Sequence, residues 1–551
     1  MSPPPAGRPT GPDATASGPV PILGGMATSA EHHDLLIIGS GSGNSLISEH
    51  WKGRSVVIAD SGTFGGTCLN VGCIPTKMYA YPAGLAALPP EARSLGVGLE
   101  FTGADFPAIR DRIFTRIDGI SRDGLRYRRD DLDYTSVIQE EVRFVGPRRV
   151  RTASGREITA DQVVVAAGSR PTLPEIPGLD LPSVHTSDTV MRLDRLPRRL
   201  LVVGGGFIAC EFASVFAGLG TEVVQVNRGH RLLKQHDMSV STTFTKIAAR
   251  RWDLRTGWTP AGIEPVEDAE RAADGWVRVR LDRAGGQEQT GIVEEAIEAD
   301  TVLIAVGRTP NTDRLDPAAA GLDVTDDGVL ASDEHQRALS DGAPVEGVYV
   351  LGDVANTWQL KHVANHEARV VAHNLEHPDD LRANTLGPVP AAVFTHPQAA
   401  SVGLTVEQAL ADYGADAITV KTQSFGDVAY GWAMEDTEGV CTVVAEKATG
   451  RILGGHILGH EAANLIQPLV TGMAFGIDAH RLARGQYWPH PALTEVVENA
   501  LLGLDVPVVL TGAMQPAGVA GGDAWPNLFG AMRALHRGVA PGVHLYFDGQ
   551  L

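Results

Sequence analysis

Residues 34–44 read Asp34-Leu-Leu-Ile-Ile-Gly39-Ser-Gly41-Ser-Gly43-Asn44, and residues 55–60 read Ser-Val-Val-Ile-Ala-Asp. An apolar run that ends in closely spaced glycines predicts a buried β-strand, a tight turn and a helix, and the second run predicts another strand. Such glycines let the backbone approach a pyrophosphate at a helix N-terminus, where free N–H groups attract anions. The glycines of this unit expected in a dinucleotide site are Gly39, Gly41 and Gly43.

The same pattern recurs at Arg199-Leu-Leu-Val-Val-Gly204-Gly-Gly206-Phe-Ile-Ala209, followed by a second strand over residues 221–227. One such motif is weak evidence, but two, each between a predicted strand and a predicted helix, are much more specific. The position of the third glycine is occupied by Asn44 in the first copy and by Ala209 in the second. The sequence therefore predicts two βαβ dinucleotide-binding units.

Three further strands that end in glycine are predicted at residues 163–168, 301–307 and 347–352. Their order around the second unit indicates one dinucleotide-binding domain interrupted by another. From about Pro388 to Asp505 the pattern changes to alternating strands and amphipathic helices. We expect this last stretch to form a third, interface-forming domain.

The composition excludes several classes of partner. The chain has 551 residues and a formal net charge of −20, which disfavours nucleic acid and anionic membranes as partners. No apolar run approaches the ~20 residues of a membrane-spanning helix. Four cysteines in so long a chain do not form a disulfide scaffold, so a cytoplasmic protein is expected.

Two of the four cysteines lie five residues apart in a glycine-rich turn. A disulfide needs Cα atoms within ~7 Å, so Cys68 and Cys73 could bridge if the start of the helix is distorted, which Gly72 and Pro75 favour. A helix N-terminus would also favour the thiolate that carries out exchange chemistry. A structural disulfide and half of a zinc site are the alternatives, although the sequence has no second ligand pair at zinc spacing. We expect redox chemistry and no metal.

The stretch Gly65-Gly-Thr-Cys68-Leu-Asn-Val-Gly-Cys73-Ile-Pro-Thr-Lys77, with both nucleotide motifs, Gly352-Asp353 and His490-Pro491, resembles the pyridine nucleotide–disulfide oxidoreductases of the glutathione-reductase type. The resemblance covers about residues 33–505 in the same order. It implies an α/β fold with two Rossmann-like domains, for FAD and for NADPH, the second inserted in the first, and a C-terminal α+β dimerisation domain. It also implies a small-molecule disulfide substrate and a homodimer whose active sites are shared between subunits.

The domain boundaries follow from this resemblance and from the changes in pattern. Residues 1–30, rich in proline, glycine and alanine, are expected to be a disordered leader. The expected domains are an FAD-binding domain over 31–190 and 313–386, an NADPH-binding domain over 191–312, a dimerisation domain over 387–505, and a tail over 506–551.

The resemblance also implies roles for individual residues. Cys68 would attack the substrate, and Cys73 would lie against the flavin. Lys77 would lie near the flavin with Glu211 as its ion-pair partner. The residues expected to contact FAD or NADPH are Gly39, Gly41, Gly43, Asp60, Gly66, Thr67, Gly168, Gly204, Gly206, Arg228, Lys234, Gly307 and Asp353.

His490 matches the family's acid/base, with Glu495 as the carboxylate that orients it and with the partner subunit as its source. Histidine suits this task because its pKa lies near neutrality and a carboxylate fixes its tautomer. The chain has 18 histidines, most of them expected at the surface or in packing. A second His-Pro, His396-Pro397, lacks the following glutamate and is expected to be structural.

The second βαβ unit favours NADPH over NADH. NAD sites usually carry an acidic residue at the end of the second strand, where it binds the ribose 2′-hydroxyl. Here that position is Asn227, followed by Arg228, Arg231 and Lys234, which suit a 2′-phosphate. A solvated basic turn is the alternative explanation.

The last question that the sequence addresses is which substrate distinguishes this chain from other members of the family. Glutathione reductases carry an arginine that grips a substrate carboxylate where this chain has Glu49. The stretches Ser42-Gly-Asn-Ser, 426–436, 483–488 and Lys361–Arg369 resemble mycothione reductases within the same family, which implies mycothiol disulfide as substrate. A dihydrolipoamide dehydrogenase, another disulfide reductase of this type, and a flavin-bound redox sensor or scaffold without turnover are the alternatives. Mercuric reductase is disfavoured because the C-terminal paired cysteines are absent.

The tail, residues 506–551, lies beyond the usual end of the family and resembles an internal part of bacterial L-asparaginase. The threonine-nucleophile motif and the His-Gly-Thr-Asp-Thr segment of asparaginases are absent from the sequence, so no amidohydrolase activity is expected. A segment of this size buries too little surface to fold readily by itself. Its apolar runs at 508–510 and 543–546 are therefore expected to remain exposed or to dock on the interface domain.

Overall fold

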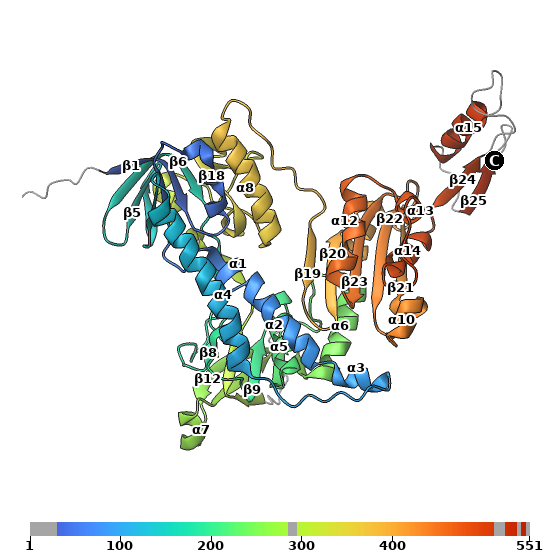
Figure 1. Cartoon of the computed structure of the whole chain (residues 1–551), viewed down its shortest axis with the longest axis horizontal. Coiled ribbons are helices and arrows are strands. Elements are labelled where there is room, and N and C mark those ends of the chain that lie inside the picture. The colour runs from blue at the N-terminus through green and yellow to red at the C-terminus, as the bar shows by residue number, and fades with distance from the viewer. Residues whose placement is uncertain (1–29, 285–294, 512–523, 537–541, 547–551) are drawn as a thin grey trace, which may run out of the picture.

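The computed structural model describes residues 30–284, 295–511, 524–536 and 542–546. Figure 1 shows two neighbouring α/β domains, a third domain built on its own sheet, and the tail projecting from that third domain. The leader expected over residues 1–30 lies outside the described residues except at its last position. Within the described ranges, no helix combines the length and the apolar composition that crossing a bilayer requires.

The first domain is organised around strand β1 (Glu31–Ile38), whose last four residues are fully buried. Burial on both faces is typical of a central strand in a parallel sheet. The sheet order is β17-β18-β6-β1-β2-β3, with β4 and β5 hairpinned onto β6. The other strands are β2 (Val56–Ala59), β3 (Thr135–Ile138), β4 (Val142–Gly146), β5 (Arg149–Thr152), β6 (Glu157–Val165), β17 (Arg337–Ser340) and β18 (Ala343–Val350).

Strands β1, β6 and β18 run parallel, so their carboxyl ends meet at one edge of the sheet. Gly39, Gly168 and Gly352 follow these three ends, and such an edge is where α/β sheets bind ligands. The helices of this domain are α1 (Gly66–Asn70), α2 (Cys73–Ala86), α3 (Pro89–Ser94), α4 (Phe106–Arg126) and α8 (Lys361–Glu376).

The prediction of a helix after Gly43 is wrong. Two short 3-10 turns, Gly43–Leu46 and Glu49–Trp51, replace it. Serine side chains compete for the backbone hydrogen bonds that a helix would use. Ser45 Oγ donates to the Ser42 carbonyl, and Ser48 Oγ accepts from the His50 amide.

Gly43 nevertheless fulfils the packing role of the missing third glycine. A Cβ at this position would lie 2.8 Å from Ile37 Cγ2 and 2.9 Å from Ala166 Cβ, so only glycine lets the turn pack on β1 and β6. Asn44, at the formal third position, instead accepts a hydrogen bond from Arg128 Nε at 2.8 Å. The glycine requirement has therefore moved one residue earlier in the chain.

The second domain contains the βαβ unit predicted at residues 199–227, which is confirmed as β9 (Arg199–Val203), α5 (Phe207–Gly218) and β10 (Glu222–Asn227). Its parallel sheet has the order β11-β10-β9-β15-β8, beside an antiparallel sheet β12-β13-β14. The remaining elements are β7 (Ser169–Pro171), β8 (Val184–His185), β11 (Asp253–Thr256), β12 (Trp258–Pro265), β13 (Val277–Arg283), β14 (Glu295–Ala299), β15 (Thr301–Ile304), β16 (Arg308–Pro310), α6 (Met238–Arg251) and α7 (Ala269–Ala273).

Helices α2 and α5 connect the first two domains through a close crossing. A Cβ on Gly218 would lie 2.7 Å from the Ala83 carbonyl oxygen, so the two backbones approach as closely as a glycine allows. Tyr79, also on α2 and 1% exposed, donates its hydroxyl to the Met191 carbonyl at 2.7 Å. These contacts fix α2 against the second domain.

The third domain is an antiparallel sheet in the order β19-β20-β23-β22-β21, with helix α14 packed on β21 and β22. The strands are β19 (Pro390–Val393), β20 (Gln398–Gly403), β21 (Ile418–Ser424), β22 (Val440–Glu446) and β23 (Ile452–Gly459). The helices are α9 (Val406–Tyr413), α10 (Ala429–Ala433), α11 (Ala462–Leu465), α12 (Gln467–Ala474), α13 (Ala479–Arg484) and α14 (Glu495–Leu502).

In the tail, the two apolar runs pair with each other, a pairing that the sequence analysis did not predict. β24 (Pro507–Thr511) and β25 (Gly542–Tyr546) form a parallel pair, and α15 (Ala524–His536) connects them. Parallel strands need such a crossover connection, and a helix is its usual form. The asparaginase-like segment therefore forms a small βαβ unit.

The close crossing of α2 and α5 gives a matched test. Gly218→Ala should lower the free energy of unfolding by about 1–2 kcal/mol, the cost of overpacking less the gain in helix propensity. Gly119→Ala, on α4, has no atom within 4 Å of the added Cβ and should raise it by about 0.5–1 kcal/mol. Thermal unfolding midpoints of both variants and the wild type measure the difference. A midpoint for Gly218→Ala at or above that of Gly119→Ala would contradict the packing argument.

Candidate active site

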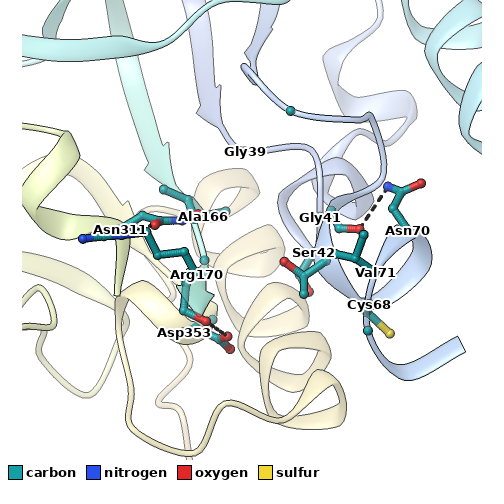
Figure 2. Close-up of a pocket in the computed structure, with 18 of the residues that line it drawn as sticks. Gly39, Gly41, Ser42, Cys68, Asn70, Val71, Ala166, Arg170, Asn311 and Asp353 are labelled. Carbon is teal, nitrogen blue, oxygen red and sulfur yellow. Dashed lines mark hydrogen bonds between the residues drawn. The ribbon is translucent and has the colours of Figure 1, made fainter. Parts of the chain in front are cut away.

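A cavity of about 530 Å³ opens where the carboxyl ends of β1, β6 and β18 meet helices α1, α2 and α5. Figure 2 shows Gly39, Gly41, Ser42 and Cys68 across the cavity from Asp353 and Arg170. The predicted site residues that line this cavity are Gly39, Gly41, Asp60, Gly66, Thr67, Cys68, Cys73, Lys77, Gly168, Glu211 and Asp353. The predicted site residues that do not line it are Gly43, Gly204, Gly206, Arg228, Lys234, Gly307, His490 and Glu495.

The first wall of the cavity is the turn after β1. Gly39 has φ +106°, and a Cβ there would lie 2.3 Å from the Ala166 carbonyl oxygen. A Cβ on Gly66 (φ +73°) would lie 2.6 Å from Gly41 Cα, so the turn and the start of α1 touch through bare backbone. This is the close approach that a pyrophosphate cradle needs.

Ser40 joins the parts of this wall, and sequence reasoning missed it. Its amide and hydroxyl both donate to Asp60 Oδ2, at 2.7 and 2.5 Å, and its hydroxyl accepts from the Gly65 amide at 2.8 Å. One side chain therefore ties the glycine turn, the end of β2 and the loop that leads to Cys68. A serine between two glycines is common in such turns, so the sequence carried no distinct signal.

The opposite wall is the Gly352-Asp353 turn. Ser169 Oγ donates to Asp353 Oδ2 at 2.6 Å, and Arg308 Nε donates to Ser169 Oγ at 2.8 Å. Glu367 on α8, 2% exposed, accepts from the Gly352 amide at 2.7 Å. Burial raises the pKa of Glu367 to about 7. Arg308 and Glu367 position this turn from elements distant in sequence, and residue type alone did not identify them.

Cys68 on α1 and Cys73 at the start of α2 are free thiols that line the same cavity. A Cβ on Gly72 would lie 2.9 Å from the Thr67 carbonyl oxygen, so this glycine allows the break between the helices that brings them together. Cys73 is the first residue of α2, where the helix N-terminus favours a thiolate.

The two thiols differ in pKa. A hydrogen bond from the Cys68 thiol, opposed by burial and helped by Lys77, lowers the pKa of Cys73 to about 7. The same hydrogen bond, together with burial, raises the pKa of Cys68 well above its ordinary value. Near neutral pH the pair therefore holds its negative charge on Cys73 and its proton on Cys68.

Lys77 and Glu211 form an ion pair beside Cys73. Lys77 Nζ lies 2.9 Å from both carboxylate oxygens of Glu211, whose side chain is 4% exposed. Glu211 Oε1 also accepts from the Phe394 amide at 2.8 Å, and the ammonium lies 4.8 Å from the centre of the Phe394 ring. A buried carboxylate needs this number of partners to remain charged at low cost.

His490 and Glu495 form a second, separate pair. His490 Nδ1 lies 2.7 Å from Glu495 Oε1, and Glu495 Oε2 accepts from the Ala492 amide at 3.3 Å. The His490 side chain is 73% exposed. The pair lies at the start of α14, on the side of the third domain away from α1 and α2 (Figure 1). Within one chain it does not reach the cysteines.

The second nucleotide motif lies at the end of β9. Gly204 has φ +134°, and a Cβ there would lie 2.2 Å from the Ala305 carbonyl oxygen. Asn227 Nδ2 donates to the carbonyls of Gly229 and Arg231, at 2.9 and 3.0 Å, and so shapes the turn after β10. Of the three predicted basic residues of this turn, Arg228 and Lys234 are exposed and have no hydrogen-bond or ion-pair partner within the described ranges, whereas the Arg231 guanidinium contacts the Met238 sulfur.

The remaining histidine-proline and cysteine residues behave as structural residues. His396 Nε2 lies 2.7 Å from Glu91 Oε1, outside the cavity. Cys210 and Cys441 are completely buried, and burial raises the pKa of each thiol to about 12. Among the residues that the structure describes, no three acidic, histidine or cysteine side chains converge as a metal site.

Comparison with known proteins agrees with this arrangement. Residues 33–368 match the family Pyridine nucleotide-disulphide oxidoreductase, residues 389–501 match its dimerisation domain, and residues 494–551 match the N-terminal part of Asparaginase. The chain is similar to the Mycothione reductase of Mycobacterium tuberculosis, with 47% identity over 482 residues, which cover 86% of this chain and 100% of the relative.

The chain is also similar to the Glutathione reductase of Burkholderia cepacia, with 31% identity over 474 residues, which cover 84% of this chain and 97% of the relative. Among solved structures, the HOCl-induced flavoprotein disulfide reductase RclA from Escherichia coli has a TM-score of 0.71 and 25% identity, covering 85% of this chain and 99% of that chain. A dinucleotide cradle, a paired dithiol and a dimerisation domain occur together in one chain, and this chain belongs to the pyridine nucleotide-disulphide oxidoreductase family.

Proposed function

We propose that this enzyme uses FAD and NADPH to reduce the disulfide of a low-molecular-weight thiol, mycothiol disulfide in particular. The observation that carries the proposal is that Cys68 and Cys73, both free thiols, line the same cavity as the glycine turn after β1. A cytoplasmic location and the absence of nucleic-acid and membrane partners belong to the same proposal, supported by the net charge of −20 and the four cysteines.

The cavity suits FAD. Gly39, Gly41 and Gly66 leave room for a pyrophosphate against bare backbone, while Asp60 and Asp353 offer carboxylates on opposite walls. When bound, FAD would supply the electrons, drawn from NADPH, that reduce the Cys68–Cys73 disulfide to a dithiol.

The turn after β10 suits the 2′-phosphate of NADPH. Arg228 and Lys234 carry exposed positive charges there. Asn227 occupies the position at which an acidic residue would repel a phosphate. Gly204 and Gly206, with Gly307, would lie along the pyrophosphate and nicotinamide side of that site. These assignments support NADPH as the preferred reductant.

The chain's own thiols would carry out the exchange in two steps. The Cys68 thiolate attacks one substrate sulfur, so that a Cys68–substrate disulfide forms and the substrate S–S bond breaks. The departing thiolate takes a proton and leaves as the first thiol. Cys73, as a thiolate, then attacks Cys68 Sγ, restores the Cys68–Cys73 disulfide and releases the second thiolate, which takes a second proton from solvent. The balance is two electrons and two protons for each disulfide.

His490 would serve this exchange from the partner subunit. Its Nε2 is free to accept the Cys68 proton and return it to the leaving thiolate, because Nδ1 is held by Glu495. Its exposure and its distance from the cavity of its own chain fit a histidine that acts across a homodimer, and the match to a dimerisation domain supports such a dimer.

Mycothiol disulfide is favoured as substrate by two observations. The relative at 47% identity, matched over its full length, is a Mycothione reductase, whereas the Glutathione reductase relative has 31% identity. Glu49, exposed on the second 3-10 turn, stands where glutathione reductases carry the arginine that grips a substrate carboxylate, and its negative charge would repel the carboxylates of glutathione disulfide. Dihydrolipoamide is the alternative substrate, and a flavin-bound sensor without turnover is the non-enzymatic alternative.

The substrate proposal is tested by supplying the purified holoenzyme with NADPH and, in turn, with mycothiol, glutathione and lipoamide disulfides. We expect kcat/KM for mycothiol disulfide to exceed the other two by at least about tenfold, equivalent to ~1.4 kcal/mol of transition-state stabilisation. Glutathione or lipoamide as the best substrate would refute the assignment, and no turnover with any of the three would favour the sensor.

The roles of the two cysteines are separated by single substitutions. Cys68→Ser should lose disulfide turnover but keep a long-wavelength charge-transfer absorbance, because the Cys73 thiolate would still face the flavin. That band should fade as the pH falls, since the Cys73 thiolate then gains a proton. Cys73→Ser serves as the matched control and should lack the band. The reverse pattern would exchange the two roles.

The shared site is tested by mixing two inactive proteins, Cys68→Ser and His490→Ala, and letting their subunits exchange. In a mixed dimer one of the two sites would combine an intact Cys68 with an intact His490, so about a quarter of wild-type activity should return when exchange is complete. Exchange is followed with differently tagged subunits. No recovery in a confirmed mixed dimer would place both residues in the site of one subunit.

A further inference from the structure

Two stretches singled out in the sequence, Ser42-Gly-Asn-Ser and Lys361–Arg369, have no part in the mechanism above. One hydrogen bond joins them, because Lys361 Nζ donates to Ser42 Oγ at 2.8 Å. Both residues line the same cavity as Cys68, and Figure 2 shows Ser42 and Cys68 on the same side of it. The contact therefore places an ammonium group at the wall that carries the attacking thiol.

Helix stability does not account for this lysine. Lys361 is the first residue of α8, where the helix dipole disfavours a positive charge. Its side chain makes no ion pair within the described part of the chain, and the residue is half-buried. An unpaired, half-buried cation is costly unless a negative charge develops beside it.

Cys68 is the group that needs such a cation. Its hydrogen bond to Cys73 and its burial raise its pKa, which opposes formation of the nucleophile, whereas the charge of Lys361 lowers it. The other two charged groups that act on the pair, Lys77 on α2 and Glu211 on α5, are already paired with each other.

We propose that Lys361, held in place by Ser42, stabilises the Cys68 thiolate as it forms and attacks the disulfide. This inference rests on the disulfide-exchange function proposed above and adds a second residue that assists the attack by Cys68. His490 of the partner subunit would remove the proton, and Lys361 would hold the negative charge left on Cys68 Sγ. Ser42 is a positioning residue, which acts through the lysine.

The test measures thiol reactivity and needs no disulfide substrate, so it is independent of substrate identity. The holoenzyme is reduced with NADPH and treated with iodoacetamide between pH 6 and 9, and alkylation of the Cys68 and Cys73 peptides is followed by mass spectrometry. Lys361→Met should slow alkylation of Cys68 at pH 7 by about threefold or more, because a rise of half a pKa unit reduces the thiolate fraction by that factor.

Two further variants separate charge from shape. Lys361→Arg keeps the charge and should restore most of the Cys68 rate. Lys52→Met removes an exposed lysine of the same domain and should leave the rate unchanged. Ser42→Ala releases the Lys361 ammonium from its hydrogen bond and should also slow the alkylation of Cys68. This variant provides the test if Lys361→Met fails to retain FAD.

The same variants are compared in the pH profile of kcat/KM for disulfide reduction. The rise of kcat/KM with pH should shift to higher pH in Lys361→Met. Equal alkylation of Cys68 in wild type and Lys361→Met, or no restoration by Lys361→Arg, would overturn the inference. Slowed alkylation in an enzyme that reduces no disulfide would instead refute the proposed function and leave the electrostatic coupling in place.

Discussion

The ion pair between Lys77 and Glu211 is the interaction on which the rest of the site depends. Its three participants come from three parts of the chain, since Lys77 lies on α2, Glu211 on α5 and the Phe394 amide immediately after β19. Removal of Glu211 would leave a partly buried ammonium and the Phe394 amide without this partner, which costs more than the loss of the attraction itself. The pair therefore fixes Cys73, one turn before Lys77 on the same helix, relative to all three domains.

The sequence predicted most of the fold because its strongest signals are local. A buried strand that ends in closely spaced glycines is visible without any partner, and the second βαβ unit was found as predicted. The helix after Gly43 was not, because Ser45 and Ser48 give the backbone alternative hydrogen bonds that the glycine pattern does not reveal. Pairing between β24 and β25 was also missed, since it depends on a crossover connection and not on either strand alone.

For the site, too, local signals were found in the sequence and tertiary contacts were missed. Cys68 and Cys73 could be found from spacing, and the Lys77–Glu211 contact followed from family resemblance. Ser40 was missed, and Lys361 and Glu367 were included only within a stretch noted for its resemblance, because each is an ordinary polar residue whose role comes from the segment that folds against it. Glu367, for example, matters through the Gly352 amide, fifteen residues earlier in the chain. Tertiary contacts of this kind leave no periodic trace in one sequence.

The close crossing of α2 and α5 restricts how the two nucleotide-binding domains can move. With Gly218 against the Ala83 backbone and Tyr79 bonded to Met191, a hinge between these domains would have to break buried contacts on both sides of α2. The two domains should therefore diffuse and fluctuate as one body. We therefore expect ligand entry to depend on side chains at the cavity mouth and not on a hinge between these two domains.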